Sequence, residues 1–180
     1  MQSDQVPPVR LARLDELEEA GAIIAASFES FRASLPPHIF EPYVADASNL
    51  AAVWDDAAVA VMEHAGRIVG TVTYYEDAQR EGMGWPSGYA GLRTLAVAPE
   101  AQGHGYGRKL CQWCIDRARE QPAEALALHT AEFMKSACKL YESLGFQRRP
   151  RRDLVASGVL GFDPAHGDQR IIAYELPIDR

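Results

Sequence analysis

A glycine-rich loop between an apolar strand and an amphipathic helix is the most informative segment of this sequence. The run 92–97 is apolar and β-rich, Pro99 ends it, and Gly103, Gly105 and Gly107 lead into a helix that begins around Tyr106. The first backbone N–H groups of a helix lack partners within the helix, and the helix dipole adds partial positive charge. Glycines let an anion approach that backbone, so the junction predicts a binding site for a phosphate-bearing ligand.

The spacing of the glycines separates several classes of phosphate site. The alternating glycines do not form the Gly-x-Gly-x-x-Gly fingerprint of dinucleotide-binding folds, and no Gly-x-x-x-x-Gly-Lys-Ser/Thr run is present. A nucleotide-binding protein is therefore disfavoured. Taken alone, the glycines could also serve only a tight strand-to-helix turn.

Strand and helix patterns are mixed along the rest of the chain. Two β-rich runs, 58–64 and 67–76, flank Ala65-Gly66 and predict a hairpin. Helical spacing follows Asp15 and recurs at 106–121 and 136–143. The Pro-rich run 34–49 predicts a loop or broken helix. These elements predict a single domain over residues 1–180 with a mainly antiparallel sheet and helices on both faces.

Charge and composition narrow the function. The formal net charge of -7 argues against nucleic acid or an anionic membrane as partner, although the basic run 147–152 could meet ligand phosphates or be a solvated edge strand. No window of roughly 18 apolar residues and no signal peptide is evident, which favours the cytoplasm. Cys111 and Cys114 are expected to be packing residues rather than metal ligands.

Two motifs resemble those of the GNAT (GCN5-related) N-acetyltransferase superfamily. The first follows a strand ending in a Val-x-Pro phrase and places Gln102, Gly105 and Gly107 in register with the family's Gln/Arg-x-x-Gly-x-Gly/Ala pattern. The second matches the family's Ala-x-x-Leu-Tyr-Glu-x-Leu-Gly-Phe signature and reads Ala137-Cys138-Lys139-Leu140-Tyr141-Glu142-Ser143-Leu144-Gly145-Phe146. The resemblance covers most of residues 8–178 and implies an α/β (α+β) GNAT fold with a mixed, mostly antiparallel sheet of six or seven strands.

The resemblance also implies acetyl-CoA as the acyl donor, an amine as the acceptor and no metal. Main-chain groups of Leu95, Ala96 and Val97 would hold the pantetheine arm. The pyrophosphate would lie on the loop and the start of the helix, formed by Gln102, Gly103, His104, Gly105, Tyr106, Gly107 and Arg108. A backbone N–H near Val97 would stabilise the oxyanion.

The sequence offers one candidate for the catalytic acid and three for the catalytic base. By its place in the second motif, Tyr141 resembles the tyrosine that protonates the departing thiolate. For the base, the resemblance favours Glu76 at the end of the hairpin, where many relatives place a carboxylate; His129 has a suitable ordinary pKa, and Glu132 is a third option. Many relatives carry Asn where this chain has Met134, which weakens detailed copying of the mechanism.

Two alternatives remain open at this stage. The chain could be a non-catalytic acyl-CoA-binding regulatory module rather than an enzyme that acetylates a primary amine by direct attack. The strand 170–176 could be an exposed edge that supports a homodimer, or it could pack within the monomer. The acceptor cleft is expected to draw on aromatic and imidazole side chains, namely Phe31, His38, Phe40, Tyr43, Trp85 and Tyr89.

Overall fold

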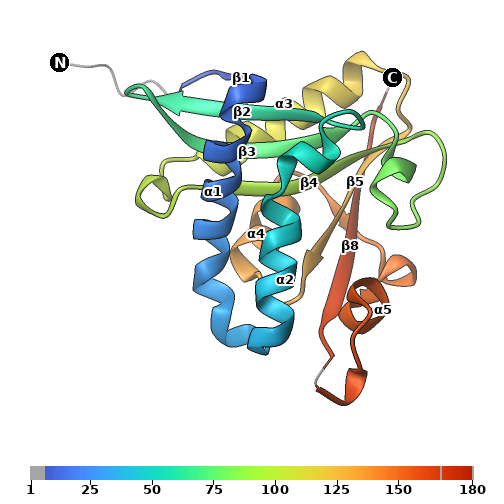
Figure 1. Cartoon of the computed structure of the whole chain (residues 1–180). Coiled ribbons are helices and arrows are strands. Elements are labelled where there is room, and N and C mark those ends of the chain that lie inside the picture. The colour runs from blue at the N-terminus through green and yellow to red at the C-terminus, as the bar shows by residue number, and fades with distance from the viewer. Residues whose placement is uncertain (1–6, 167, 180) are drawn as a thin grey trace.

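The β-rich runs of the sequence form a mixed sheet that helices cover on both faces (Figure 1). The computed structural model describes residues 7–166 and 168–179. The strands are β1 (Val9–Leu11), β2 (Ala58–His64), β3 (Arg67–Tyr75), β4 (Tyr89–Val97), β5 (Ala125–Ala131), β6 (Gln147–Arg148), β7 (Leu154–Val155) and β8 (Arg170–Pro177). The α-helices are α1 (Leu17–Phe28), α2 (Pro37–Ser48), α3 (Tyr106–Glu120), α4 (Lys135–Ser143) and α5 (Ala156–Leu160).

The strand order is β1-β2-β3-β4-β5-β8-β6, and β7 also pairs with β8. Only the β4–β5 pair is parallel among the described strands; every other pair is antiparallel. The expected mixed, mostly antiparallel sheet is confirmed. It has eight strands in the described residues rather than six or seven, because the short segments β6 and β7 both pair with β8.

The two faces of the sheet carry different helices. Side chains alternate along a strand, so Tyr74 and Leu92, which are paired across β3 and β4, share one face. The Tyr74 ring contacts Trp113 of α3 edge-on at 6.1 Å between centroids, and Tyr174 of β8 lies 6.1 Å from Tyr141 of α4. Figure 1 shows α3 and α4 behind the sheet and α1 and α2 in front of it.

The parallel pair in the middle of the sheet opens into a fork. β4 and β5 pair only over Tyr89–Gly91 with Ala125–Ala127, and then the two strands separate. Beyond the fork, β4 contains a bulge in which Thr94 and Leu95 together oppose Val72 of β3. Thr94 has a φ of 49°, which a β-branched residue rarely adopts. Such strain is often found at functional sites, and this one lies on the open arm of the fork.

Helix α2 differs from the loop or broken helix expected for 34–49. The helix runs without a break through Pro37–Ser48, with Pro37 in its first turn and Pro42 inside. A proline in the first turn removes no intrahelical hydrogen bond, whereas Pro42 removes one. Packing offsets that loss, because Ile39 and Phe40 are buried in the core. Helix propensities read from the sequence do not include this packing energy.

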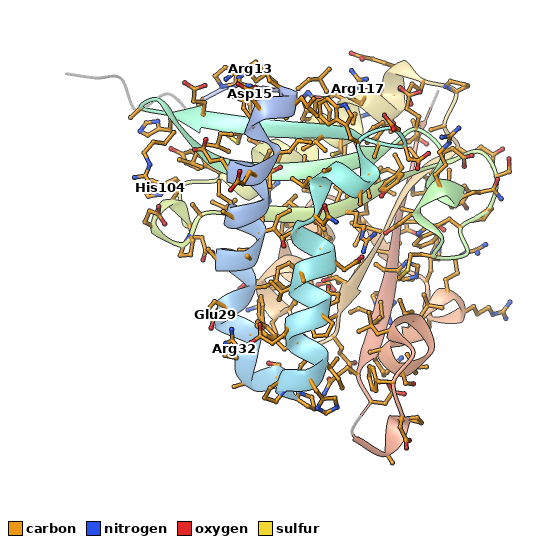
Figure 2. The ribbon with its side chains drawn as sticks, viewed as in Figure 1. Arg13, Asp15, Glu29, Arg32, His104 and Arg117 are labelled. Carbon is orange, nitrogen blue, oxygen red and sulfur yellow. The ribbon has the colours of Figure 1, made fainter. Side chains whose placement is uncertain are left out.

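A close approach of α1 and α2 depends on Gly21. A Cβ at this position would collide with the carbonyl oxygen of Ser48 at the end of α2. The two helices are also linked at their other ends, where Arg32 pairs with Glu29 and Glu41. Figure 2 shows Glu29 and Arg32 together below α1. Helix α2 is thereby held beside α1, and its Asp46 accepts a hydrogen bond from Arg93 of β4.

The C-terminal strand is not an exposed edge. β8 pairs with β5 on one side and with β6 and β7 on the other, so of the two alternatives for 170–176 the strand packs within the monomer and is not an exposed edge. The basic run 147–152 forms β6 and the turn after it, where Arg148 and Arg149 pair with Asp153 and Glu175.

None of the helices in the described ranges has the length and apolarity that a membrane span requires. The first six residues, where no signal peptide was expected, lie outside the described residues. The cytoplasmic location stays a prediction.

Candidate active site

The glycine loop leaves the start of α3 open to a ligand. Gly103 and Gly105 adopt φ values of 83° and 80°, in the left-handed region that favours glycine. Gly105 is the N-cap and has no side chain to cap the helix, and the first turn carries no acidic residue. Its open N–H groups, together with Arg108, suit the pyrophosphate expected at residues 102–108.

The same loop is fastened to the open arm of the fork. The N–H of Ala98 bonds to the carbonyl of Val69 on the β3 side, and successive peptide groups of a strand point in opposite directions. The N–H and C=O of Val97 therefore face the fork. Gln102 Nε2 donates to the Val97 carbonyl at 3.3 Å, which anchors the loop and leaves the Val97 N–H open.

Helix α4 borders the loop on its other side. Arg108 donates to Ser143 Oγ at 2.6 Å, so the first turn of α3 and the last turn of α4 are joined directly. His104 Nδ1 lies 3.0 Å from the carbonyl of Gln102, and the His104 ring stands 5.8 Å from that of Tyr106. The two sequence motifs thus meet in space beside the fork, as the resemblance implies.

A cavity of about 610 Å³ passes through the fork, a volume within the range of small-molecule sites. Its lining draws on both faces of the sheet, with α4 on one side and α2, α5 and the segment 81–83 on the other. The lining residues with polar or titratable side chains include His38, Tyr43, Asp46, Glu81, Arg93, Thr94, His129, Thr130, Tyr141 and Gln169. Such a cavity lets two substrates meet from opposite faces.

Tyr141 lines this cavity from the α4 side. Its side chain is buried, with 5% of the residue exposed, and its ring contacts Phe146 and Tyr174. Burial, reinforced by the neighbouring cysteines, raises the pKa of the Tyr141 hydroxyl far above its ordinary value. The phenol is therefore protonated at neutral pH and can serve only as an acid toward a strong base.

Three unpartnered polar atoms gather on the opposite face. The described part of the chain holds four buried side-chain polar atoms without a hydrogen-bond partner, and three of them are Glu81 Oε2, Trp85 Nε1 and His129 Nδ1. The Trp85 and His129 rings are 4.5 Å apart. Buried polar atoms normally find partners. The Trp85 indole and the Glu81 carboxyl still interact with each other, whereas His129 Nδ1 faces no donor among the described residues. The sequence did not single out Glu81.

Glu81 and Arg93 surround this end of the cavity. Burial raises the pKa of the Glu81 carboxyl to about 7, although the charge of Arg93 and the nearby Trp85 indole oppose the shift. Arg93 and His129 are each two residues beyond the last paired residues of the fork, so they share one face on its two arms. A carboxyl group with this pKa can exchange a proton near neutral pH.

His129 is present as a neutral imidazole. Its Nε2 lies 2.9 Å from the carbonyl of Arg152, which can only accept, so Nε2 carries the proton and Nδ1 offers a lone pair. Burial lowers the pKa of His129. The ring can therefore accept a proton, but more weakly than an ordinary histidine.

The other two predicted bases lie outside this cavity. Glu76 follows β3, its side chain is 68% exposed, and it accepts from Gln121 Nε2 at 2.9 Å and pairs with Arg117. Arg117 lies toward the opposite end of α3 from His104 (Figure 2). Glu132 pairs with Arg170 at 3.6 Å and is also not among the lining residues.

The remaining expectations about the cleft hold in part. His38 and Tyr43 line the cavity, whereas Phe40 and Trp85 are buried in the hydrophobic cores. Met134 lines the cavity and is the N-cap of α4. Cys111 and Cys114 are fully buried free thiols within the core, which confirms them as packing residues.

Comparison with known proteins shows to which family this fold belongs. The family model described as the acetyltransferase (GNAT) family matches residues 22–146. That match covers more than half of the chain, which therefore belongs to the GNAT family. The expected family and fold are confirmed.

Individual relatives match shorter parts. A 57-residue stretch, 32% of this chain, is 43% identical to "Probable N-acetyltransferase camello" of Xenopus laevis, 26% of whose length it spans. The IAA acetyltransferase of Azospirillum brasilense is 26% identical over 144 residues, 80% of this chain and 88% of that protein. The camello protein of Xenopus tropicalis is likewise matched over only 40% of its length.

Solved structures show the same fold. YncA of Salmonella typhimurium, determined with its cofactor acetyl-CoA, superposes with a TM-score of 0.65 at 18% identity, covering 98% of this chain and 96% of that chain.

Proposed function

We propose that the protein is an N-acetyltransferase that transfers acetyl from acetyl-CoA to a primary amine by direct attack within a ternary complex. The observation that carries the proposal is the cavity through the β4–β5 fork, which is lined by Tyr141 on one face and by Glu81 on the other. The open start of α3 is joined to α4, the helix that carries Tyr141, by the Arg108–Ser143 hydrogen bond. The family's acetyl-CoA-binding members support the choice of donor.

The chain offers a suitable group for each part of acetyl-CoA. The open N–H groups of the first turn of α3, with Arg108, would hold the pyrophosphate, and the unpaired edge of β4 at residues 95–97 would hold the pantetheine arm. The bound donor supplies a thioester carbonyl at the fork.

Each proton can then be assigned to a residue of the chain. Glu81 accepts a proton from the ammonium group of the acceptor, whose nitrogen forms the new bond to the carbonyl carbon. The open N–H of Val97 donates to the oxyanion. As the C–S bond breaks, Tyr141 donates its proton to the sulfur, the proton that the nitrogen loses as the amide forms replaces it on the Tyr141 oxygen, and Glu81 releases its proton to solvent. His129 is the second candidate base. We favour Glu81 because a base with a pKa near the working pH is the more effective one, and Glu76 lies outside the cavity.

The direct test measures free thiol released from acetyl-CoA in the presence of a panel of amines, alongside the thermal shift caused by CoA alone. A stability rise together with amine-dependent thiol release is expected. Stabilisation without release from any amine would favour the alternative, a non-catalytic acyl-CoA-binding module. The absence of any stabilisation would remove the basis of the proposal.

A further inference from the structure

The cavity at the fork continues into a second hollow beside α5. This second cavity measures about 670 Å³ and shares Gly82, Met83 and Val159 with the first. It lies between the segment 82–84 and the residues that lead into and form α5. The acceptor side of the site is therefore a groove that runs from Glu81 outward to α5, rather than a closed pocket.

The wall of this groove at α5 is apolar and faces solvent. Five large hydrophobic residues are exposed among those that the structure describes, and three of them are Val155, Val159 and Leu160, with exposed fractions of 47%, 40% and 36%. Each of the three lines one or both cavities. Apolar surface left open beside a reactive centre fits an apolar ligand body.

The arginine side chains along the groove are already paired with carboxylates of the chain. Arg93 donates to Asp46 at 3.1 Å, and its positive charge is also felt by Glu81. Arg170 pairs with Asp153 at 2.8 Å and with Glu132. Both arginines of the groove are thus committed to carboxylates of the chain. The negative charge of ionised Glu81 compensates an ammonium group beside it. A ligand carboxylate at the same place would be repelled by Glu81 and Asp46.

From this groove we infer that the acceptor is a primary amine carried on an apolar or aromatic body, without a carboxylate next to the amine. The amine lies beside Glu81 at the fork, and the apolar body lies against Met83 and the exposed face of α5. The inference rests on the proposed function, since it names the acceptor class for that site.

Matched pairs of amines test the charge rule. The rate of thiol release from acetyl-CoA is measured with 2-phenylethylamine against phenylalanine and with tryptamine against tryptophan, and spermidine and a tripeptide represent polar acceptors. We expect kcat/KM at least about tenfold higher for each carboxylate-free aromatic amine than for its amino acid and for the polar acceptors. Equal or reversed preferences would overturn the inference.

Variants locate the apolar body. Val159→Asp should lower kcat/KM for 2-phenylethylamine about tenfold, with the milder Val159→Ala as a second variant, while the thermal shift with CoA stays unchanged. Leu14→Asp is the matched control, because Leu14 is 67% exposed and lies outside both cavities. Asp46→Asn, which leaves Arg93 less compensated, should narrow the gap between 2-phenylethylamine and phenylalanine several-fold.

Direct binding separates this inference from the proposed function. Calorimetry with CoA-saturated protein measures the affinity for 2-phenylethylamine and phenylalanine without turnover. Val159-dependent binding of the amine without thiol release would uphold the acceptor site and refute the acetyltransferase. Turnover that is confined to amino acids or peptides would uphold the acetyltransferase and refute the acceptor class. No binding and no turnover with aromatic amines would also refute the acceptor class.

Discussion

Two glutamates five positions apart show how the fold sets the chemistry of a carboxyl group. Glu76 is exposed and is bound by Gln121 and Arg117, far along α3 from the glycine loop. Glu81 lies in the cavity with one oxygen buried and unpartnered, and its pKa is raised to about 7. Glu76 ends a β-rich run, whereas Glu81 stands in a segment without periodicity, so the sequence favours Glu76 and only the packing of 78–85 brings Glu81 into the cavity.

Replacing Glu81 by Gln should therefore lower kcat by about 100-fold, the size typical for loss of a general base. The active form of Glu81 is the ionised one, so the wild-type rate should rise with pH through about 7, and this rise should be absent in the variant. Initial rates between pH 5.5 and 9 measure both effects. Glu76→Gln is the control and should retain wild-type activity; the opposite pattern would assign the base to Glu76.

At Tyr141, removal of the hydroxyl alone tests the acid. Tyr141→Phe keeps the ring contacts with Phe146 and Tyr174, so the fold should be unaffected. We expect kcat to fall at least tenfold with little change in the KM for acetyl-CoA, because the proton is needed only as the thiolate departs. Steady-state kinetics and a thermal unfolding curve check the two halves of this prediction. An unchanged kcat would mean that water protonates the sulfur.

At the scale of elements, the α1–α2 contact sets the position of one wall of the cavity. Gly21→Ala adds a methyl group where the Ser48 carbonyl already lies, and overpacking of this kind costs about 1–3 kcal/mol. The gain in helix propensity, up to about 1 kcal/mol, offsets only part of that cost. Chemical denaturation measures the difference. The exposed Ala22→Gly isolates the propensity term on the same helix, and a more stable Gly21→Ala would refute the close contact.

Elements with strong local patterns could be predicted from the sequence, and those shaped by tertiary contacts could not. The hairpin of β2 and β3, the glycine loop, α3 and α4 follow from alternation, helical spacing and the two motifs. Helix α2 could not be predicted because Pro42 argues against it, and the burial of Ile39 and Phe40 in the core, which offsets that loss, is a tertiary effect. The segment 77–88 has no periodicity, so the burial of Glu81 and Trp85 left no signal beyond their chemical type.

At the scale of the whole molecule, three carboxyl groups make the stability of the fold depend on pH, two of them in one direction and the third in the other. Arg10 and Arg13 hold the pKa of Glu16 down to about 2, and Arg148, Ala173 N–H and Arg170 hold that of Asp153 down to about 2 despite burial. The stability that these two provide is present above their unfolded values and is lost as pH falls from about 4.5 toward 2. Glu81 acts in the other direction. Its raised pKa means that ionisation costs up to about 3 kcal/mol as pH rises from 4.5 past 7.

Glu81 should therefore lower the melting temperature as pH rises through 7, whereas Glu16 and Asp153 lower it as pH falls below 4.5, and His129, whose pKa burial lowers, adds to the loss on the acid side. In Glu81→Gln the decline between pH 5 and 8 should largely disappear, and the decline below pH 4.5 should remain. Thermal unfolding at a series of pH values measures both. An equal loss in the variant above pH 5 would show that Glu81 is not the group responsible. A variant that is more stable and yet inactive would show that Glu81 lowers the stability of the fold and is needed for activity.

The fork has a mechanical consequence for the molecule. In the described part of the chain, strands β1–β4 and strands β5–β8 are joined in the sheet by three residue pairs, Tyr89–Gly91 with Ala125–Ala127, and by the hydrogen bond from the Glu124 N–H to the Gly88 carbonyl just before them. The sheet thus consists of two halves that are joined by one short parallel ladder. A pantetheine arm bound along β4 would extend that ladder where β4 and β5 have separated. Bound CoA would then couple the two halves of the sheet, so that amide exchange slows both in β1–β4 and in β5–β8 when CoA binds.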